Sequence, residues 1–212
     1  YSLIRQAIKG LKSPLVVLPG CEISTDDAHV LALLPPEEST EKDAYSAYKI
    51  AFMLRACNFK VEDYGVLERT GSKSVLETVR MITDDGGIGI PAHIDGGNKA
   101  LLDHYKKPGT IYENILNEPG LNALEILKES TINKKFGKCE TLQQYFSRIR
   151  KEPKFPVAFI QDSDGHSFTE IAQRFTYVKM EEPSFYSLKN ALEDPEARLR
   201  LAKEIKPYTG KT

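Results

Sequence analysis

Hydrophobic and polar positions switch repeatedly between a helical and a strand-like spacing along the chain. Val75, Val79 and Ile82 form an apolar stripe at helical spacing, and short apolar runs bounded by Pro, Gly or polar clusters are typical of buried strands. We expect helices over residues 2–12, 41–56 (with Ser39 or Thr40 as N-cap), 72–87, 142–149, 184–192 and 195–205, and strands over residues 14–18, 28–34, 88–93, 122–127, 156–160 and 174–180.

This order of elements predicts an α/β fold, because strands that alternate with helices favour a mainly parallel sheet. About six strands are too few to close a full barrel. The chain begins at Tyr1, without Met, directly in a helical pattern, so we expect a fragment whose first segment is missing. We expect one domain over residues 1–205 and a flexible tail over residues 206–212.

Composition, net charge and cysteine spacing limit the classes of protein to which this chain can belong. With 212 residues, of which 41% are hydrophobic, the chain can bury one substantial core. A net charge of −1 gives no strong field that would favour nucleic acid or an anionic membrane, and no apolar run approaches the roughly 18 residues of a membrane span. Cys21, Cys57 and Cys139 are far apart and form no CxxC pair, which favours a reducing cytoplasm over a disulfide framework or a thiolate zinc site.

Imidazole and carboxylate side chains gather at the ends of the expected strands. Glu22 follows the first strand in LPGCE, His29 opens the second, His93 ends the third in GIPAH, and Asp164 and His166 follow PVAFI. In a parallel α/β sheet, ligands bind outside the carboxyl ends of the strands. Imidazole and carboxylate groups suit divalent Mn, Zn or Fe, so we expect a metal site formed by these residues.

The acidic turn DSDGHS also has a purely structural interpretation. Asp162 and Asp164 fit an Asx turn or a helix cap, and SFTE, from Ser167 to Glu170, has the pattern of a capping box with Ser167 as the cap. We therefore interpret Asp162 as structural and Ser167 as the N-cap of a following helix. We interpret His104, within the helical pattern ALLDHYKK, as structural or solvated.

Two cations are candidates for substrate binding. Lys99 follows Gly96 and Gly97, whose backbone amides could approach a phosphate; the alternative is a plain turn in which Asn98 caps the next helix. Arg174 is either a phosphate contact or a salt-bridged arginine at a strand end. The chain contains no GxxxxGK[ST] motif and no basic stripe with interleaved aromatic residues, so it carries no sign of a P-loop ATPase or of a nucleic-acid groove.

Taken in order, the motifs LPGCEI, AHVLAL, GGIGIPAH, NALEI and DSDGHS resemble the PHP (polymerase and histidinol phosphatase) family. The run AQRFTYVKMEEPSFYSLKNALEDPEARL is similar to PHP domains fused to SMC-like ATPases, a group linked with nucleic-acid metabolism and phage defence. The resemblance implies a distorted (β/α)7 TIM-like barrel of the PHP type, which in this chain would lack its N-terminal strand. It also implies a centre of two or three metals and hydrolysis of a phosphoester, with nucleic acid or nucleotides as substrates.

Residue by residue, the resemblance makes Glu22 the carboxylate that bridges two metals, with His29 and His93 completing the ligands of one. Asp164 would bind the other metal, and His166 would help to hold a third. Glu22, His93 and Asp164 would thus be the catalytic residues, and Glu125 in NALEIL would lie near the site as a supporting residue.

One difference between this sequence and the PHP family leaves more than one functional hypothesis open. The family begins with an HxH motif that supplies two further ligands, and this chain has none. As it stands, the chain would hold one metal well and a second poorly. The first hypothesis is a metal-dependent phosphoesterase. The second is a non-catalytic module with a degenerate metal site that serves as a scaffold or regulator of an attached ATPase. A metallo-amidohydrolase is a third, weaker hypothesis.

Overall fold

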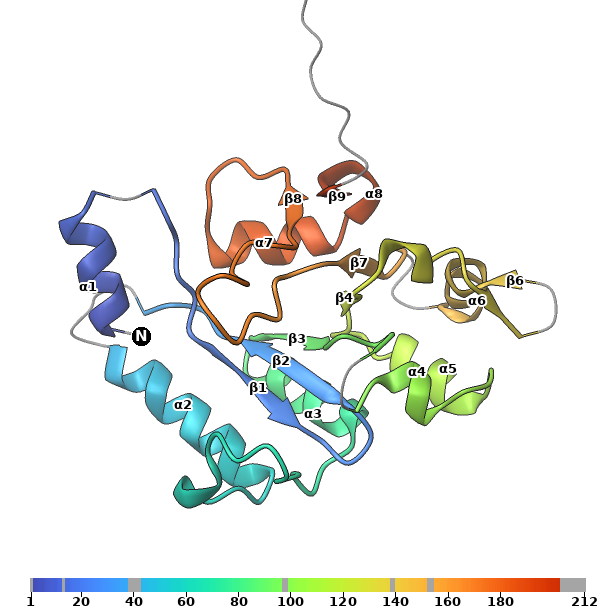
Figure 1. The fold of residues 1–212 in the computed structure, drawn as a ribbon, viewed down its shortest axis with the longest axis horizontal. Coiled ribbons are helices and arrows are strands. Elements are labelled where there is room, and N and C mark those ends of the chain that lie inside the picture. The colour runs from blue at the N-terminus through green and yellow to red at the C-terminus, as the bar shows by residue number, and fades with distance from the viewer. Residues whose placement is uncertain are drawn as a thin grey trace, which may run out of the picture.

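The computed structural model describes residues 2–12, 14–37, 43–96, 99–137, 140–151 and 155–202. Figure 1 shows the arrangement of its elements. The helices are α1 (Ser2–Gly10), α2 (Asp43–Ala56), η2 (Val61–Asp63), α3 (Val75–Asp84), α4 (Leu101–His104), α5 (Thr110–Leu116), η3 (Glu129–Thr131), α6 (Leu142–Ile149), α7 (Phe185–Leu192) and α8 (Pro195–Arg198). The strands are β1 (Gly20–Ser24), β2 (His29–Leu33), β3 (Ile88–Pro91), β4 (Ala123–Glu125), β5 (Lys135–Phe136), β6 (Glu140–Thr141), β7 (Ala158–Ile160), β8 (Thr176–Val178) and β9 (Leu199–Leu201).

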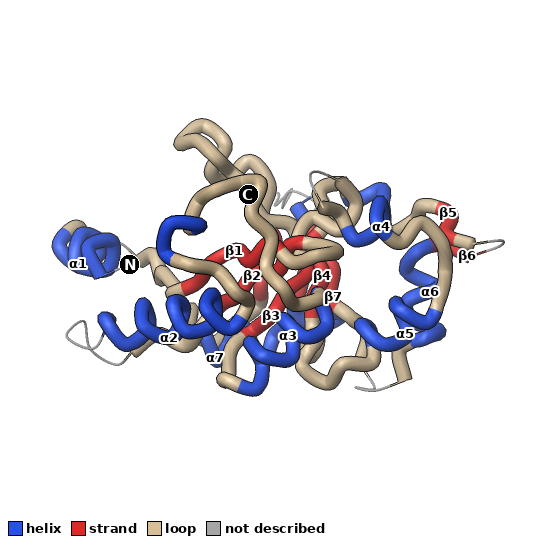
Figure 2. The backbone as a smooth tube through the Cα atoms, turned by 90° about the horizontal axis from the view of Figure 1, so that it is seen from below, coloured by secondary structure: helices blue, strands red, loops and turns tan. Residues whose placement is uncertain are grey.

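The main sheet has three antiparallel strands in the order β1-β2-β3. Strands β1 and β2 form a hairpin in which Ser24 pairs with His29, and the turn between them is closed by a 2.8 Å hydrogen bond from Thr25 N to Ala28 O. Strand β4 lies beside the end of β3, since Ile94 N donates to Glu125 O, and pairs in parallel with β7. These five strands run through the centre of the molecule in Figure 2.

The predicted fold class was wrong. The described residues form small sheets of two or three strands and no closed barrel, and only β4 and β7 pair in parallel. The turn between β1 and β2 is too short for the crossover of about a dozen residues that parallel neighbours need, so it can only close a hairpin. Helices α2, η2 and α3 separate β2 from β3, and the chain re-enters the sheet at the end where it left, which makes this pair antiparallel as well.

The strands of the sheet contribute side chains to two hydrophobic cores, one on each face of the sheet. Because side chains alternate along a strand, Ile23 and Val30 face the core beneath α3, where they meet Ile82. Ile90 faces the opposite core, where it meets Phe185 of α7. Helices α3 and α7 thus cover opposite faces of the sheet (Figure 1). Full burial of each such side chain contributes about 1.5–3 kcal/mol.

Several predicted elements differ from the structure at their ends. No strand forms over residues 14–18, where Leu15 and Val16 are exposed; β1 instead begins at Gly20. The predicted closing helix ends at Arg198, and its continuation is strand β9, which pairs with β8. Leu199 and Leu201 are buried on either side of an exposed Arg200, and three residues are too few to distinguish this alternation from a helical stripe.

The helix predicted after Ser167 is also wrong, since residues 168–173 form turns. In a capping box, Glu170 would accept a hydrogen bond from the backbone N–H of Ser167. Its carboxylate instead accepts a 2.8 Å hydrogen bond from His166 N. Phe168 is 96% exposed and Ile171 is 60% exposed. A short helix here would have no apolar face packed on a core, and isolated short helices are not stable in water.

Some predictions fall outside the described residues: the caps at Ser39 and Thr40, the environment of Cys139, the turn at Gly97 and Asn98, and the tail over residues 206–212. Among the described helices, none is long and apolar enough to cross a lipid bilayer.

The tight approach of α3 to the sheet can be tested at Gly87, which links them. A Cβ atom at this position would lie 2.8 Å from Leu33 O and 2.9 Å from Ile82 O, both backbone atoms that cannot move aside. We predict that Gly87→Ala lowers the free energy of unfolding by about 1–3 kcal/mol in urea denaturation. Gly10→Ala is the control, because a Cβ atom there meets nothing within 4 Å. Equal losses in both variants would contradict the tight packing at Gly87.

Candidate metal centre

The β1–β2 hairpin brings Glu22 and His29 to the same face of the sheet. Glu22 pairs with Leu31, and His29 lies two residues before Leu31 on the same strand. Side chains of paired residues share a face, as do those of residues two apart. Glu22 and His29 are therefore neighbours through the register of the hairpin alone, and His29 Nδ1 lies 2.6 Å from Glu22 Oε1.

His93 reaches the same point from β3. Ala92 N donates a 2.9 Å hydrogen bond to His29 O, which extends the β2–β3 pairing past the end of the strand. The next residue, His93, has a φ of 29°, in the left-handed region that non-glycine residues seldom adopt. His93 Nε2 lies 3.3 Å from Glu22 Oε1 and 3.3 Å from His29 Nδ1.

Electrostatics keep the Glu22 carboxylate charged. Hydrogen bonds from His29 and then from His93 lower the pKa of Glu22 to about 2, although burial opposes the shift. Burial alone would lower the pKa of His93, but the hydrogen bond and charge of Glu22, with the charges of Glu125 and Asp164, raise it overall. The side chain of His93 is 7% exposed and that of Glu22 is 37% exposed. The site is therefore accessible to solvent at Glu22 and closed at His93.

Two of the three separations among these side chains match those of metal ligands, and the third, 2.6 Å between His29 Nδ1 and Glu22 Oε1, is that of a hydrogen bond. Four tetrahedral ligands at about 2.1 Å from a metal lie about 3.4 Å apart, close to the two 3.3 Å separations that His93 Nε2 makes. Each residue offers a ligand atom within 4.8 Å of the other two. The remaining ring nitrogens, His29 Nε2 and His93 Nδ1, are buried without a hydrogen-bond partner among the described residues. The rings are thus oriented by Glu22 and by packing, and the donor set fits Zn, Mn or Fe.

Asp164 and His166 lie at the margin of this group. Asp164 is close enough to His93 to raise its pKa, and its own φ is 42°. His166 Nε2 is 3.8 Å from Asp164 Oδ1, but the His166 side chain is 78% exposed. Neither residue joins the group that Glu22 forms with the two histidines. Asp162 Oδ1 accepts a 2.8 Å hydrogen bond from Asp164 N, which is the Asx turn that the sequence indicated.

Glu125 supports the site from β4. Its Oε2 accepts a 2.9 Å hydrogen bond from His93 N, and the residue is 1% exposed. Burial, followed by the charge of nearby Asp162, raises the pKa of Glu125 to about 8. The second oxygen, Oε1, is buried without a geometrically acceptable hydrogen-bond partner in the described structure. Glu125 thus positions the backbone of His93 and brings a buried carboxyl group to the site, beside the exposed Glu22.

Both cations suggested for substrate binding hold backbone in place. Lys99 Nζ donates a 2.8 Å hydrogen bond to Thr25 O and a further one to the Thr70 hydroxyl, which ties its loop to the turn of the hairpin. Arg174 donates to Asp162 O at 3.2 Å and to Ser163 O at 2.9 Å, so it braces the acidic turn. Their contact with a substrate stays a prediction.

A pocket of about 310 Å³ adjoins the centre, and the sequence did not reveal it. Glu22 and His29 lie in its wall, together with Cys21, Ser24, Leu54, Phe59, Asp63, Tyr64, Gly65, Val66, Leu67 and Arg69. Residues 61–69, which close one side, carry no recognisable motif. Burial raises the pKa of Cys21 to about 12, so its thiol stays protonated and is a poor nucleophile.

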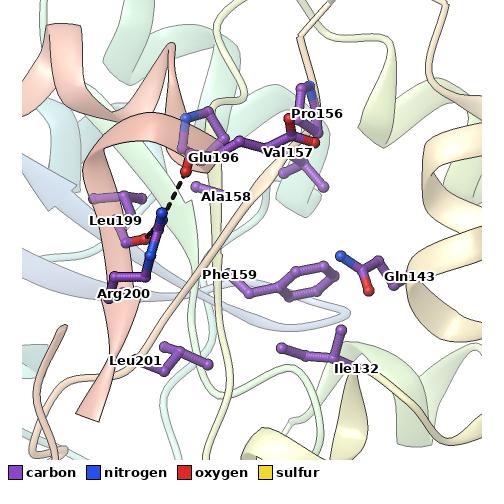
Figure 3. Close-up of a pocket in the computed structure, with 11 residues that line it drawn as sticks. Ile132, Gln143, Pro156, Val157, Ala158, Phe159, Glu196, Leu199, Arg200 and Leu201 are labelled. Atoms are coloured by element: carbon purple, nitrogen blue, oxygen red, sulfur yellow. Dashed lines mark hydrogen bonds between the residues drawn. The ribbon is translucent and has the colours of Figure 1, made fainter. Parts of the chain in front are cut away.

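A second pocket, of about 290 Å³, lies between β7, β9 and α6 (Figure 3). Its lining is largely apolar. Arg200 donates hydrogen bonds to Glu196 O at 2.6 Å and to Leu199 O at 2.5 Å. None of the residues of the candidate metal centre lines it.

The chain matches no model of a known protein family, and no curated protein matches it significantly. The resemblance of its ordered motifs to the PHP family stays a prediction.

Glu125 makes the stability of the metal-free protein depend on pH. Its pKa in the folded state, about 8, lies above the ordinary 4.5, so the folded protein keeps a proton that the unfolded chain releases. The free energy of unfolding should therefore fall as pH rises from about 5 to about 8. We predict that Glu125→Gln removes most of this fall in urea denaturation with a chelator present. Gln keeps the oxygen that accepts from His93 N.

Glu140→Gln is the control for this measurement. Glu140 is paired with Arg148 at the surface, and this hydrogen bond lowers its pKa, so its titration lies below the pH range tested. If the free energy of unfolding of wild type and of Glu125→Gln depended on pH in the same way, Glu125 would be ionised in the folded protein, and the prediction would be wrong.

Proposed function

We propose that Glu22, His29 and His93 bind a divalent metal ion and that the protein uses it to hydrolyse a phosphoester. The observation that carries the proposal is the Glu22 carboxylate oxygen, which lies 2.6 Å and 3.3 Å from nitrogens of two histidines on different strands. A divalent ion at such a site lowers the pKa of bound water and neutralises charge on a phosphoryl oxygen.

The protein's own residues prepare the site for this chemistry. Glu22 is ionised at neutral pH, and the hairpin register holds it against His29 before any ion binds. In the hydrolysis, the oxygen of water bonds to phosphorus, the ester P–O bond breaks, and the leaving oxygen takes a proton. Asp164, whose charge acts on His93, and His166, 3.8 Å from Asp164, are the groups that can relay that proton.

Hydrolysis of a phosphoester is favoured by the ordered motifs that resemble PHP phosphoesterases. Binding of a second and third metal by Asp164 and His166 stays a prediction, as do an SMC-like ATPase partner and the cytoplasm as compartment. A metal-binding module without catalysis is the second candidate, because only one complete three-ligand group exists among the described residues.

Metal binding is tested by equilibrium dialysis or calorimetry with Mn²⁺ and Zn²⁺. Loss of even a supporting partner commonly weakens a metal site 10–100-fold, so Glu22→Gln and His93→Ala should each weaken binding by about 100-fold or more. His104→Ala is the matched control, because His104 is exposed, makes an edge-to-face contact with Tyr105 and does not belong to the group of three ligands. A loss of the same size in His104→Ala, or retained binding in both ligand variants, would place the ion elsewhere.

Catalysis is tested with para-nitrophenyl phosphate and its bis-ester. We predict hydrolysis that a chelator abolishes and Mn²⁺ restores, with kcat lowered by about 100-fold in Asp164→Asn through loss of proton transfer. Circular dichroism should show retained folding. A protein that binds Mn²⁺ through Glu22 yet hydrolyses neither ester would be the non-catalytic module instead.

A further inference from the structure

Helix α1 leaves its apolar face largely uncovered. Its large apolar side chains lie on one face at helical spacing. The helical turn includes Leu11, since Leu11 N donates a 2.9 Å hydrogen bond to Ala7 O. Leu3 is 77% exposed, Ile4 is 54% exposed and Leu11 is 80% exposed. A helix with a distinct apolar face usually packs that face on a core, so this face of α1 has the pattern of a surface that another molecule covers.

Helix α6 shows how the same chain treats a comparable helix. It is divided as sharply as α1 into an apolar and a polar face. The apolar side chains of α6 are buried in the core: Leu142, Tyr145, Phe146 and Ile149. Those side chains of α3 that face the sheet are buried as well. The exposed apolar face of α1 is therefore a property of this helix and not of short helices in this fold.

The charged side chains of α1 and its last turn are all cationic. Residues 2–12 contain Arg5, Lys9 and Lys12 and no carboxylate, so this segment has a charge of +3 in a chain whose net charge is −1. The rest of the chain is therefore negative, and the net charge of the whole chain hides a local excess of cations on the helix that exposes its apolar face. A partner that matches both features is apolar inside and anionic at its surface.

Helix α2 adds aromatic side chains at the same end of the molecule. It begins near α1 in both views (Figures 1 and 2). Tyr45, Tyr48 and Phe52 follow one another at helical spacing along α2, and all three are exposed. Tyrosine combines an apolar ring with a hydroxyl that stays hydrated, which suits the boundary between water and lipid. The residue types near α1 thus favour a lipid surface.

We propose that α1 attaches the protein to the surface of an anionic lipid bilayer, with its apolar face toward the acyl chains and its cations at the headgroups. A helix with a cationic polar face and a low overall hydrophobicity lies in the plane of the interface. Such a helix does not cross the bilayer, and none of the described helices is able to do so. This attachment is independent of the metal centre and goes beyond the proposed function.

Charge also decides between a bilayer and a second copy of the chain. If two copies packed α1 against α1, two groups of three cations would come together without a carboxylate from either helix. A bilayer that contains anionic lipids attracts the same cations, and its acyl chains accept apolar side chains without a preformed groove. The anionic bilayer therefore fits both faces of the helix.

The test is co-sedimentation of the whole chain with lipid vesicles, in a chelator so that no metal ion bridges protein and lipid. One set of vesicles is pure phosphatidylcholine, and the other is an equal mixture of phosphatidylcholine and phosphatidylglycerol. Binding to the anionic set should be at least about 10-fold tighter, because each cation near an anionic surface contributes a factor of about five. This binding should weaken as salt is added, since salt screens the headgroups. Equal affinity for both sets, or no sedimentation with either, overturns the proposal.

Variants assign the binding to α1. Leu3→Ser should weaken binding to the anionic vesicles by about 10-fold, because apolar contact with the acyl chains is lost. Leu67→Ser is the matched control: Leu67 has the same exposed fraction as Leu3 and lies outside α1. Lys9→Gln should weaken binding by about 5-fold, whereas Lys128→Gln, at another exposed lysine, should leave it unchanged. Because all four side chains are exposed, these variants should melt close to the wild-type temperature.

Other partners of α1 would give different results. Analytical ultracentrifugation of the free protein should show no dimer that depends on Leu3. A dimer that Leu3→Ser dissociates, without binding to vesicles, would mean that a second copy covers the helix, and it overturns the proposal. Equal losses of vesicle binding in Leu3→Ser and Leu67→Ser would place the lipid contact outside α1 and overturn it as well. None of these outcomes depends on Mn²⁺ or on ester hydrolysis, so the proposed function is tested separately.

Discussion

The register of the three-stranded sheet is the constraint on which the candidate centre depends. Glu22 opposes Leu31, two residues from His29, and Ala92 N is bonded to His29 O. These backbone contacts bring three ligand groups, from β1, β2 and the segment that follows β3, to one place, where their ligand atoms lie within 4.8 Å of one another. A slip of one residue in β1 against β2 would send Glu22 to the core beneath α3, where a charged carboxylate has no partner. Packing of the two cores and geometry of the site therefore require the same register.

Two carboxyl groups of the site are driven in opposite directions by their surroundings. Glu22 is partly exposed and accepts hydrogen bonds from two histidines, and its pKa falls to about 2. Glu125 is buried beside Asp162, and its pKa rises to about 8. A separation of this kind is typical of sites where one carboxylate binds a cation and another carries a proton. The difference comes from the surroundings of two identical side chains: hydrogen bonds from His29 and His93 lower the pKa of Glu22, whereas burial raises the pKa of Glu125.

The sequence predicted the members of the centre better than the architecture that assembles them. GGIGIPAH gave the start of β3 correctly, but the strand ends at Pro91, and His93, expected as its last residue, lies two residues beyond it. Strand direction was predicted wrongly, since alternation of helices with strands does not reveal that the helices between β2 and β3 return the chain to the same end of the sheet. The pocket at Arg69 was not foreseen, because residues 61–69 have no periodicity and meet β1 only through tertiary packing.

Asp162 and Glu125 were expected to play supporting roles, and the backbone explains how such roles can be functional. His93 and Asp164 both have positive φ, a conformation that costs a non-glycine residue of order 1–3 kcal/mol and persists only where surrounding contacts enforce it. In both residues the backbone N–H donates a hydrogen bond to a carboxylate, which helps to hold this conformation. Glu125 accepts from His93 N, and Asp162 accepts from Asp164 N. The two acceptors lie close enough for the charge of Asp162 to raise the pKa of Glu125. The buried Glu125 and the half-buried Asp162 therefore hold the backbones of two candidate site residues that follow β3 and β7, so a change in the charge of this pair would alter the contacts of both residues.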